Sequence, residues 1–287
     1  MVGSEGQTIF TAAQHGLLTA DFEASGIDPR RFGFYDQLGF LARETSEPDY
    51  LARYAEWVMT RPRSAAYEAH VRVTVPKLAH LLGAALAARD ARGCCLTAMS
   101  MMTRMLDRLQ VWSFGLFGSV ILEAPAHDLR RAIHTIAVKG APDTVAGHAW
   151  VCAPPFFIVD ISLALQCWDG AIAPLIPAVV LAAAEAPRVD ARVEDCVHEH
   201  VRAMFAEAEG FHDPYLHRRF DPRVEGFLRT FPARETIAGG LRMRFVPVAI
   251  RQPFETLAQI ELDGDEAAGR TIWNSIVGPA FGSEPLS

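Results

Sequence analysis

The sequence has few cysteines, no dense block of basic residues and no long uninterrupted hydrophobic run. Its five cysteines are Cys94, Cys95, Cys152, Cys167 and Cys196, and they form neither an even disulfide framework nor paired CxxC motifs. This usage is typical of proteins from a reducing compartment. Adjacent cysteines such as Cys94 and Cys95 also strain disulfide geometry. We therefore expect reduced thiols and a cytoplasmic protein.

Charge and hydropathy exclude two classes of partner. The formal net charge is −7, and the basic pairs Arg130-Arg131 and Arg218-Arg219 stand alone. Isolated pairs are typical of solvated faces rather than of a nucleic-acid footprint. The longest apolar stretch, near residues 172–184, contains two prolines and is shorter than the ~20 residues that span a bilayer. The polar first ten residues do not resemble a secretory signal. We expect neither nucleic acid nor a membrane as partner.

Half of the residues are hydrophobic, which is enough for a sizeable core. The pattern divides the chain into a mainly helical part (1–90), a central part that mixes a helix with strands (91–165), and an extension of helices and strands (166–287). Because no repeat or low-complexity linker separates them, we predict one α+β body.

Hydrophobic spacing and turn residues predict the main elements. A long helical pattern over residues 63–89 contains Pro76, which is expected to break or kink it. A second pattern runs from Cys95 to about Leu109. A third, from Asp190 to Glu209, ends at Gly210. Aromatic and β-branched runs predict strands over 111–122 and 241–250.

A hairpin is predicted from His148–Cys152 and Phe156–Ile161, around Ala153-Pro154-Pro155. If Cys152 pairs with Phe156, His148 lies opposite Asp160. Both side chains then share one face of the sheet, within reach of a hydrogen bond. A slip of one residue would move them to opposite faces.

The stretch Gly93-Cys94-Cys95 places a thiol at the start of a helix. Free backbone N–H groups and the positive end of the helix dipole favour a thiolate there, and the same groups can bind an oxyanion. An imidazole can accept the thiol proton, and a carboxylate can fix its tautomer. Cys95, His148 and Asp160 fit these three roles, which are those of nucleophilic acyl chemistry.

These residues resemble the transglutaminase-like branch of the papain-like cysteine enzymes. In that family a Gly-x-Cys opens a helix, a His-Ala-Trp-Val strand follows, and a further strand ends in Asp. Gly93-Cys94-Cys95, His148-Ala149-Trp150-Val151 and Val159-Asp160 match this order over roughly residues 90–162. After Asp160 the chain has Ile161-Ser162 where the family often has Pro-Thr.

The resemblance implies a core in which a helix packs on an antiparallel sheet, with extra helices before and after it. It also implies a cysteine hydrolase or acyl transferase (a protease, deamidase or transglutaminase-like enzyme) acting on a peptide or protein amide. The catalytic set would be Cys95, His148 and Asp160, with no cofactor and no metal. No acidic Ca²⁺ loop of EF-hand type is present in the sequence. Trp57 and Gln37 are candidates for a second oxyanion donor.

Other interpretations stay open at this point. Cys94 could be the nucleophile, or the same fold could serve as an inactive binding or scaffold protein. Cys196 and His200 are four residues apart on a predicted helix, a spacing that suits two zinc ligands, and His212 or His217 could add a third.

Overall fold

A computed structural model describes residues 11–137, 147–183, 186–262 and 264–286. The helices are α1 (Ala12–Ala24), α2 (Leu38–Ser46), α3 (Tyr50–Thr60), α4 (Ala65–Ala87), α5 (Cys95–Arg108), α6 (Val193–Cys196), α7 (Glu199–Glu209), α8 (Leu216–Phe220), α9 (Val224–Thr230), α10 (Ala268–Ile272) and α11 (Gly278–Phe281). The strands are β1 (Phe114–Ala124), β2 (Leu129–Ile133), β3 (His148–Ala153), β4 (Phe156–Asp160), β5 (Val180–Ala183), β6 (Arg234–Ala238) and β7 (Leu241–Arg251). Within this part of the chain, no helix is both long and apolar enough to cross a membrane.

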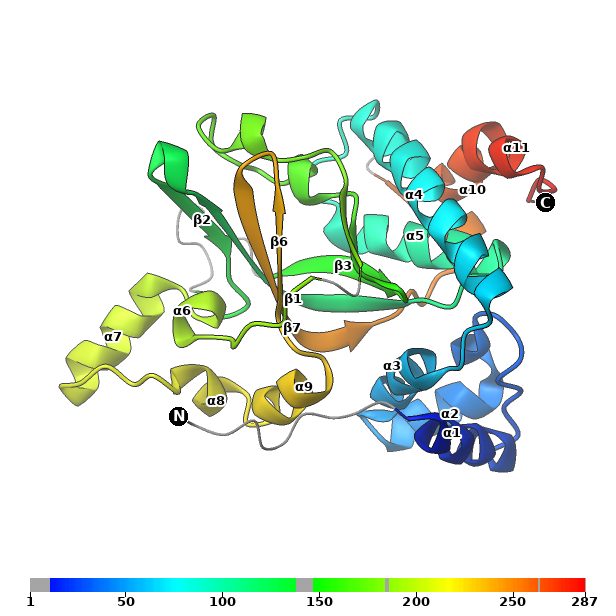
Figure 1. The fold of residues 1–287 in the computed structure, drawn as a ribbon, viewed down its shortest axis with the longest axis horizontal. Coiled ribbons are helices and arrows are strands. Elements are labelled where there is room, and N and C mark those ends of the chain that lie inside the picture. The colour runs from blue at the N-terminus through cyan, green and yellow to red at the C-terminus, as the bar shows by residue number, and fades with distance from the viewer. Residues whose placement is uncertain (1–10, 138–146, 184–185, 263, 287) are drawn as a thin grey trace.

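The strands form one antiparallel sheet in the order β5-β4-β3-β1-β7-β6, with β2 also paired to β1 (Figure 1). The long strand β1 is its centre. The first half of β1 pairs with β3, where Gly118 lies opposite His148, and its second half pairs with β2. On its other side β1 pairs with β7 along most of its length. The observed class is α+β, as predicted, and the C-terminal strand β7 lies inside the sheet.

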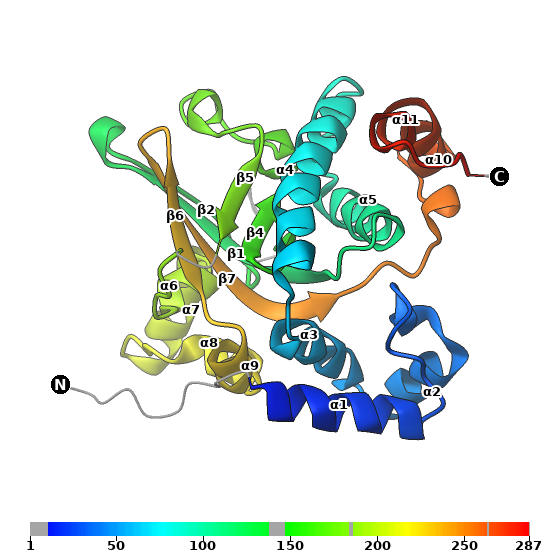
Figure 2. The same ribbon diagram turned by 45° about the vertical axis from the view of Figure 1, so that its right-hand side comes forward.

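Side chains alternate across the sheet and build two main cores. Leu116, Trp150 and Ile158 belong to the core shared with α3 and the aromatic residues of the N-terminal helices. Ala149 and Val151, on the other face of β3, belong to the core shared with α4, α5 and the C-terminal helices. Figure 2 shows α4 and α5 close to the β3–β4 side of the sheet, with α1 to α3 below them. The sheet is therefore covered by helices that precede and follow it in the sequence.

The helix α4 continues through Pro76, so the predicted break does not occur. Proline removes one backbone hydrogen bond from a helix interior. Val71, Val75 and Leu78 are fully buried on both sides of it. Burial of this apolar stripe offsets the lost hydrogen bond, because tertiary packing supplies most of a helix's stability.

The predicted single helix over Asp190–Glu209 is wrong, because α6 ends at Cys196 and α7 begins at Glu199. Between them Val197 is extended and forms a parallel bridge with Ile136. The backbone N–H of His198 donates to the Ile136 carbonyl at 2.8 Å. Backbone pairing with a distant segment replaces the helical bonds at this point. The end at Gly210 is confirmed: its φ of 78° is left-handed and its N–H bonds to Ala206.

The predicted helix from Cys95 is confirmed as α5, and its C-terminal half is fastened to the N-terminal segment. The Tyr35 hydroxyl donates to Asp107 Oδ2 at 2.6 Å. The buried guanidinium of Arg104 pairs with Asp36 and donates to the Pro253 carbonyl at 3.0 Å. Burial raises the pKa of Asp107 to about 7, against the lowering effects of the Tyr35 hydroxyl and of Arg104. These contacts fix the direction of the helix that carries Cys95.

Asp107→Asn tests this buried carboxyl. An unfolded Asp titrates near pH 3.9, so between about pH 4 and 7 the folded state binds more protons and the contribution of Asp107 to stability falls as pH rises. We expect Asp107→Asn to gain stability relative to the wild type as pH increases from about 5 to 8, by up to ~1.4 kcal/mol per pH unit below the folded pKa. Urea unfolding at several pH values measures this difference. The control Asp128→Asn replaces an exposed carboxyl and should give a pH-independent difference. If the difference in unfolding free energy between Asp107→Asn and the wild type were also independent of pH, the raised pKa of Asp107 would be contradicted.

Candidate active site

The thiol of Cys95 lies in the first turn of α5. Gly93 adopts a left-handed φ of 66° and donates its N–H to the Leu165 carbonyl at 3.0 Å. The N-cap residue Cys94 makes no side-chain capping bond to the helix, so the first N–H groups of α5 are not used by a cap. Cys95 itself is 6% exposed. A thiol in this position faces the positive end of the helix dipole and backbone donors suited to an anion.

His148 begins β3 and Asp160 ends β4, and both side chains are fully buried. Nε2 of the imidazole lies 2.7 Å from Asp160 Oδ2. This distance is that of a charge-assisted hydrogen bond. The expected His–carboxylate contact is therefore present in the structure.

The hairpin reaches this contact through a different register from the predicted one. Ala153 pairs with Phe156 around a two-residue turn, and beyond a bulge Val151 pairs with Val159. The pairing of Cys152 with Phe156 is therefore wrong. Relative to the predicted register, the strands have slipped by two residues at the Val151–Val159 pair. An even slip preserves the face on which each side chain lies, so His148 and Asp160 still meet.

Asp160 is held in place by a turn that directly follows β4. Its Oδ1 accepts hydrogen bonds from the backbone N–H of Ser162 at 2.9 Å, from the Ser162 hydroxyl at 3.2 Å and from the Leu163 N–H at 3.0 Å. Oδ2 is left for His148. The carboxylate therefore has one fixed orientation and presents a single oxygen to the imidazole.

The Cys95 thiol acts on the same imidazole. Burial by itself lowers the pKa of His148, but the Asp160 carboxylate and then the Cys95 thiol outweigh it and raise this pKa to about 10. Nδ1 of His148 nevertheless makes no hydrogen bond of standard geometry with any described residue. The thiol and the ring are therefore neighbours without a formed hydrogen bond. Because Nε2–H donates to Asp160, Nδ1 is the ring atom left for the thiol.

The side chains of the other three candidates from the sequence, Cys94, Trp57 and Gln37, form hydrogen bonds with other groups. The Cys94 thiol donates to the Ala91 carbonyl at 2.9 Å. Trp57 donates its indole N–H to the Thr19 hydroxyl at 2.9 Å. The Gln37 amide exchanges two hydrogen bonds with the backbone of Asp28. Trp57 and Gln37 therefore belong to the N-terminal helical layer and bring no described contact to Cys95.

Sequence reasoning missed two residues beside the site. Ser162 orients Asp160, and the Asp-x-Ser pattern is a known turn signal because a carboxylate can accept N–H groups two and three residues ahead. Gln166 is 3% exposed and donates to the Ser162 carbonyl at 2.8 Å, while its Oε1 has no partner among the described residues. No local signal in the sequence distinguishes Gln166.

The zinc interpretation loses its geometric basis. Cys196 and His200 lie on different helices, α6 and α7, so they do not share one helical face. Cys196 is buried in an apolar cluster, whereas His200 is exposed. In the described ranges, no group of three or more His, Cys, Asp or Glu side chains could hold a metal ion.

Asp160→Asn and Asp160→Ala test the buried pair. Breaking a buried, hydrogen-bonded ion pair costs about 3–5 kcal/mol, and we expect Asp160→Ala to lose this much free energy of unfolding near pH 7. The raised pKa of His148 adds stability that is fully present below the unfolded value near 6.5 and is lost as pH rises toward about 10. Asp160→Asn should therefore destabilise more near pH 6.5 than near pH 9, as measured by denaturant unfolding. An equal loss at both pH values would show that the imidazole is not charged in the fold.

Comparisons with protein-family models, with curated proteins and with solved structures find no match to this chain.

Proposed function

We propose that this chain is a cysteine-dependent hydrolase or acyl transferase, built on a papain-like, transglutaminase-like core. The observation that carries the proposal is the 2.7 Å contact between His148 and Asp160, fully buried, next to a thiol at a helix start. The role assigned to each residue follows from its contacts. Cys95 is the nucleophile, His148 is the base, and Asp160 positions the imidazole.

In the proposed reaction, the thiolate of Cys95 attacks the carbonyl carbon of an amide, ester or thioester. The N–H groups at the start of α5 stabilise the resulting oxyanion. The imidazolium of His148 gives its proton to the leaving amine or alcohol, and a thioester remains on Cys95. Water or an amine then attacks the thioester and gives a proton to the neutral imidazole of His148. The C–S bond breaks, Cys95 leaves as the thiolate, and the product is an acid after hydrolysis or a new amide after transfer. Asp160 keeps the imidazole in one tautomer throughout.

An open groove next to the helix start supports a peptide or protein substrate. It measures ≈ 750 Å³, and it is lined by residues that include Arg92, Cys94, Thr97, Glu261 and Glu266. This volume lies within the usual range of ligand pockets, and the open, polar groove can accept a short segment of a peptide. Charges of both signs on the walls would select side chains of the peptide.

A binding or scaffold role is the second candidate, and one observation favours it. Cys95 is 6% exposed and does not form a wall of the groove. A substrate that lies in the groove as the structure shows it would therefore not line up against Cys95. A protein that binds peptides without chemistry needs no contact with this thiol.

Site-resolved alkylation by iodoacetamide tests the thiol–imidazole pair. We expect Cys95 to react at lower pH than the exposed Cys167, and His148→Ala to slow its reaction at least tenfold near pH 6.5, because the imidazolium stabilises the attacking thiolate. Mass spectrometry of each cysteine after timed exposure gives the rates. Cys152 and Cys196, whose pKa values burial raises to about 12, should stay unmodified and report that the fold is intact. A Cys95 that is inert, or that reacts equally in both proteins, contradicts the dyad.

Acyl-enzyme trapping separates the enzyme from the scaffold. Incubation with an activated acetyl ester should leave one acetyl group on Cys95, detected by intact mass and peptide mapping, because the thioester forms faster than it hydrolyses. Cys94→Ala should still be labelled, and Cys95→Ala should not. Binding of peptides by the wild type without acylation of Cys95 would favour the scaffold role instead.

A further inference from the structure

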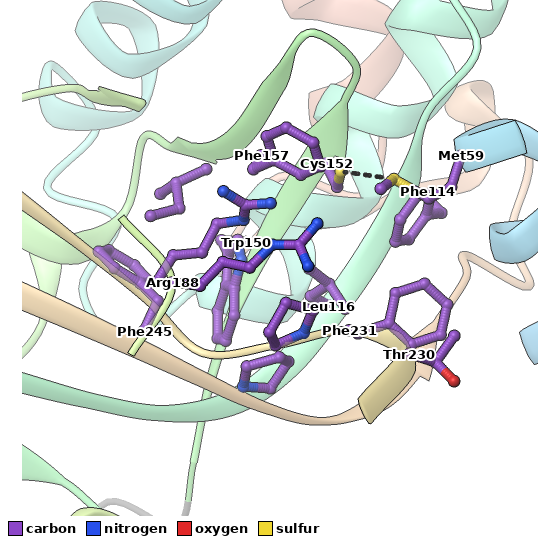
Figure 3. Close-up of a pocket in the computed structure, with 14 residues that line it drawn as sticks. Met59, Phe114, Leu116, Trp150, Cys152, Phe157, Arg188, Thr230, Phe231 and Phe245 are labelled. Carbon is purple, nitrogen blue, oxygen red and sulfur yellow. Dashed lines mark hydrogen bonds between the residues drawn. The ribbon is translucent and has the colours of Figure 1, made fainter. Parts of the chain in front are cut away.

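A second pocket lies on the sheet face that carries Trp150, where the β3–β4 hairpin meets β6 and β7. Figure 3 shows Trp150, Phe157, Phe231 and Phe245 among the side chains that line it. The pocket is partly open to solvent, and the space inside it is ≈ 30 Å³, room for about two or three water molecules at ~10–15 Å³ each. Most of its lining is apolar, and its inner end fits a small group, the rest of which can extend toward the opening.

Two guanidinium groups enter this apolar pocket, from Arg188 and Arg234. Their backbones are joined by an antiparallel bridge, which brings the two side chains to one place. Arg234 is the first residue of β6 and is 6% exposed. Its guanidinium carbon lies 3.7 Å from the centre of the Phe157 ring, and Nη1 donates to the Ala186 carbonyl at 2.8 Å.

The positive charge of Arg234 has no carboxylate partner among the described residues, where its polar contact is a backbone carbonyl. Burial lowers the pKa of Arg234, and the nearby Arg188 acts in the same direction. An arginine nevertheless stays protonated in a protein. Buried charges are normally paired, because an unpaired ion in an apolar site loses its hydration without compensation. A stacked, buried guanidinium without a described counter-ion is therefore suited to an anion supplied from outside.

We propose that this pocket binds a small carboxylate, whose two oxygens meet the Arg234 guanidinium and whose apolar part lies among Trp150, Phe157 and Phe245. Guanidinium and carboxylate match in planar, two-point hydrogen bonding. The apolar lining favours a short aliphatic carboxylate over phosphate or sulfate, which would leave oxygens unpaired there. A free carboxylic acid and the C-terminal carboxylate of a peptide share this chemistry.

The site is independent of the proposed acyl chemistry, although the two are linked through Trp150. The indole ring of Trp150 forms part of the pocket and also stacks with the His148 imidazole, at 6.5 Å between ring centres and 19° between planes. A ligand in the pocket would touch the residue that supports the imidazole. Its binding does not require Cys95 to be active.

Calorimetric titration of the full chain with matched probes at constant ionic strength tests the proposal. We expect isobutyrate to bind saturably with a Kd of about 1 mM, and its neutral isostere isobutyramide to bind at least tenfold more weakly. Arg234→Gln should lose at least tenfold in affinity for isobutyrate, whereas Arg234→Lys, which keeps the charge without the fork, should lose less. The control Arg229→Gln removes an exposed arginine of α9 and should bind as the wild type. A comparison of the affinities for N-acetylvaline and its amide, N-acetylvalinamide, tests in the same way whether the pocket binds the C-terminal carboxylate of a peptide.

The outcomes separate clearly. Tighter binding of isobutyrate assigns the pocket to free acids, and tighter binding of N-acetylvaline assigns it to chain ends. Absence of saturable binding by both acids, or equal binding of acid and amide by the wild type, overturns the proposal even if Arg234→Gln does not fold. Cys95→Ala should bind isobutyrate as the wild type does, so failure of the acyl chemistry and failure of this site can be told apart.

Discussion

The buried pair of His148 and Asp160 is the constraint on which the site depends. Both groups have lost all contact with water, so each must be satisfied by the protein. Asp160 meets this requirement with the turn at Ser162 and Leu163 on one oxygen and with the imidazole on the other. The Asp160 carboxylate raises the pKa of the imidazole to about 10, so the ring is charged in the fold. The same interaction therefore supports the end of the β3–β4 hairpin and leaves Nδ1 without a hydrogen-bond partner among the described residues.

The strand β1 brings this pair to the helix that carries the thiol. It pairs with β3 on one side and with β7 on the other, and α5 directly precedes it in the chain. Arg104 and Asp107, near the end of α5, fasten the helix to Tyr35 and Asp36 of the N-terminal segment. Parts of the chain from before and after residues 91–165 thus position the thiol relative to the imidazole. The N- and C-terminal segments are structural supports of the candidate site.

Local patterns predicted much of this arrangement, and long-range pairings limited the rest. The 3.6-residue spacing of apolar side chains after Cys95 was enough to place α5. Strand alternation permitted a shared face for His148 and Asp160 but did not determine the register that brings them together. The predicted register of the hairpin was wrong, because the amino-acid composition gives no sign of the bulge near Val151. The predicted continuous helix over residues 190–209 was wrong because Val197 pairs with Ile136. The helical spacing of apolar residues cannot reveal such a contact. The sequence did not predict the pocket around Arg234, because the residues that line it come from segments far apart in the chain.

The pairing of β1 with β7 has a consequence for the order in which the molecule is made. Ser119 lies opposite Val246, so the central strand cannot pair with this neighbour until more than a hundred further residues have been synthesised. A nascent chain that has emerged only as far as Asp160 already contains all three residues of the candidate site, but not the strand that completes the sheet beneath them. Such distant pairings close slowly and leave an apolar strand edge uncovered in the meantime. The candidate site is therefore completed only after β7 has been synthesised.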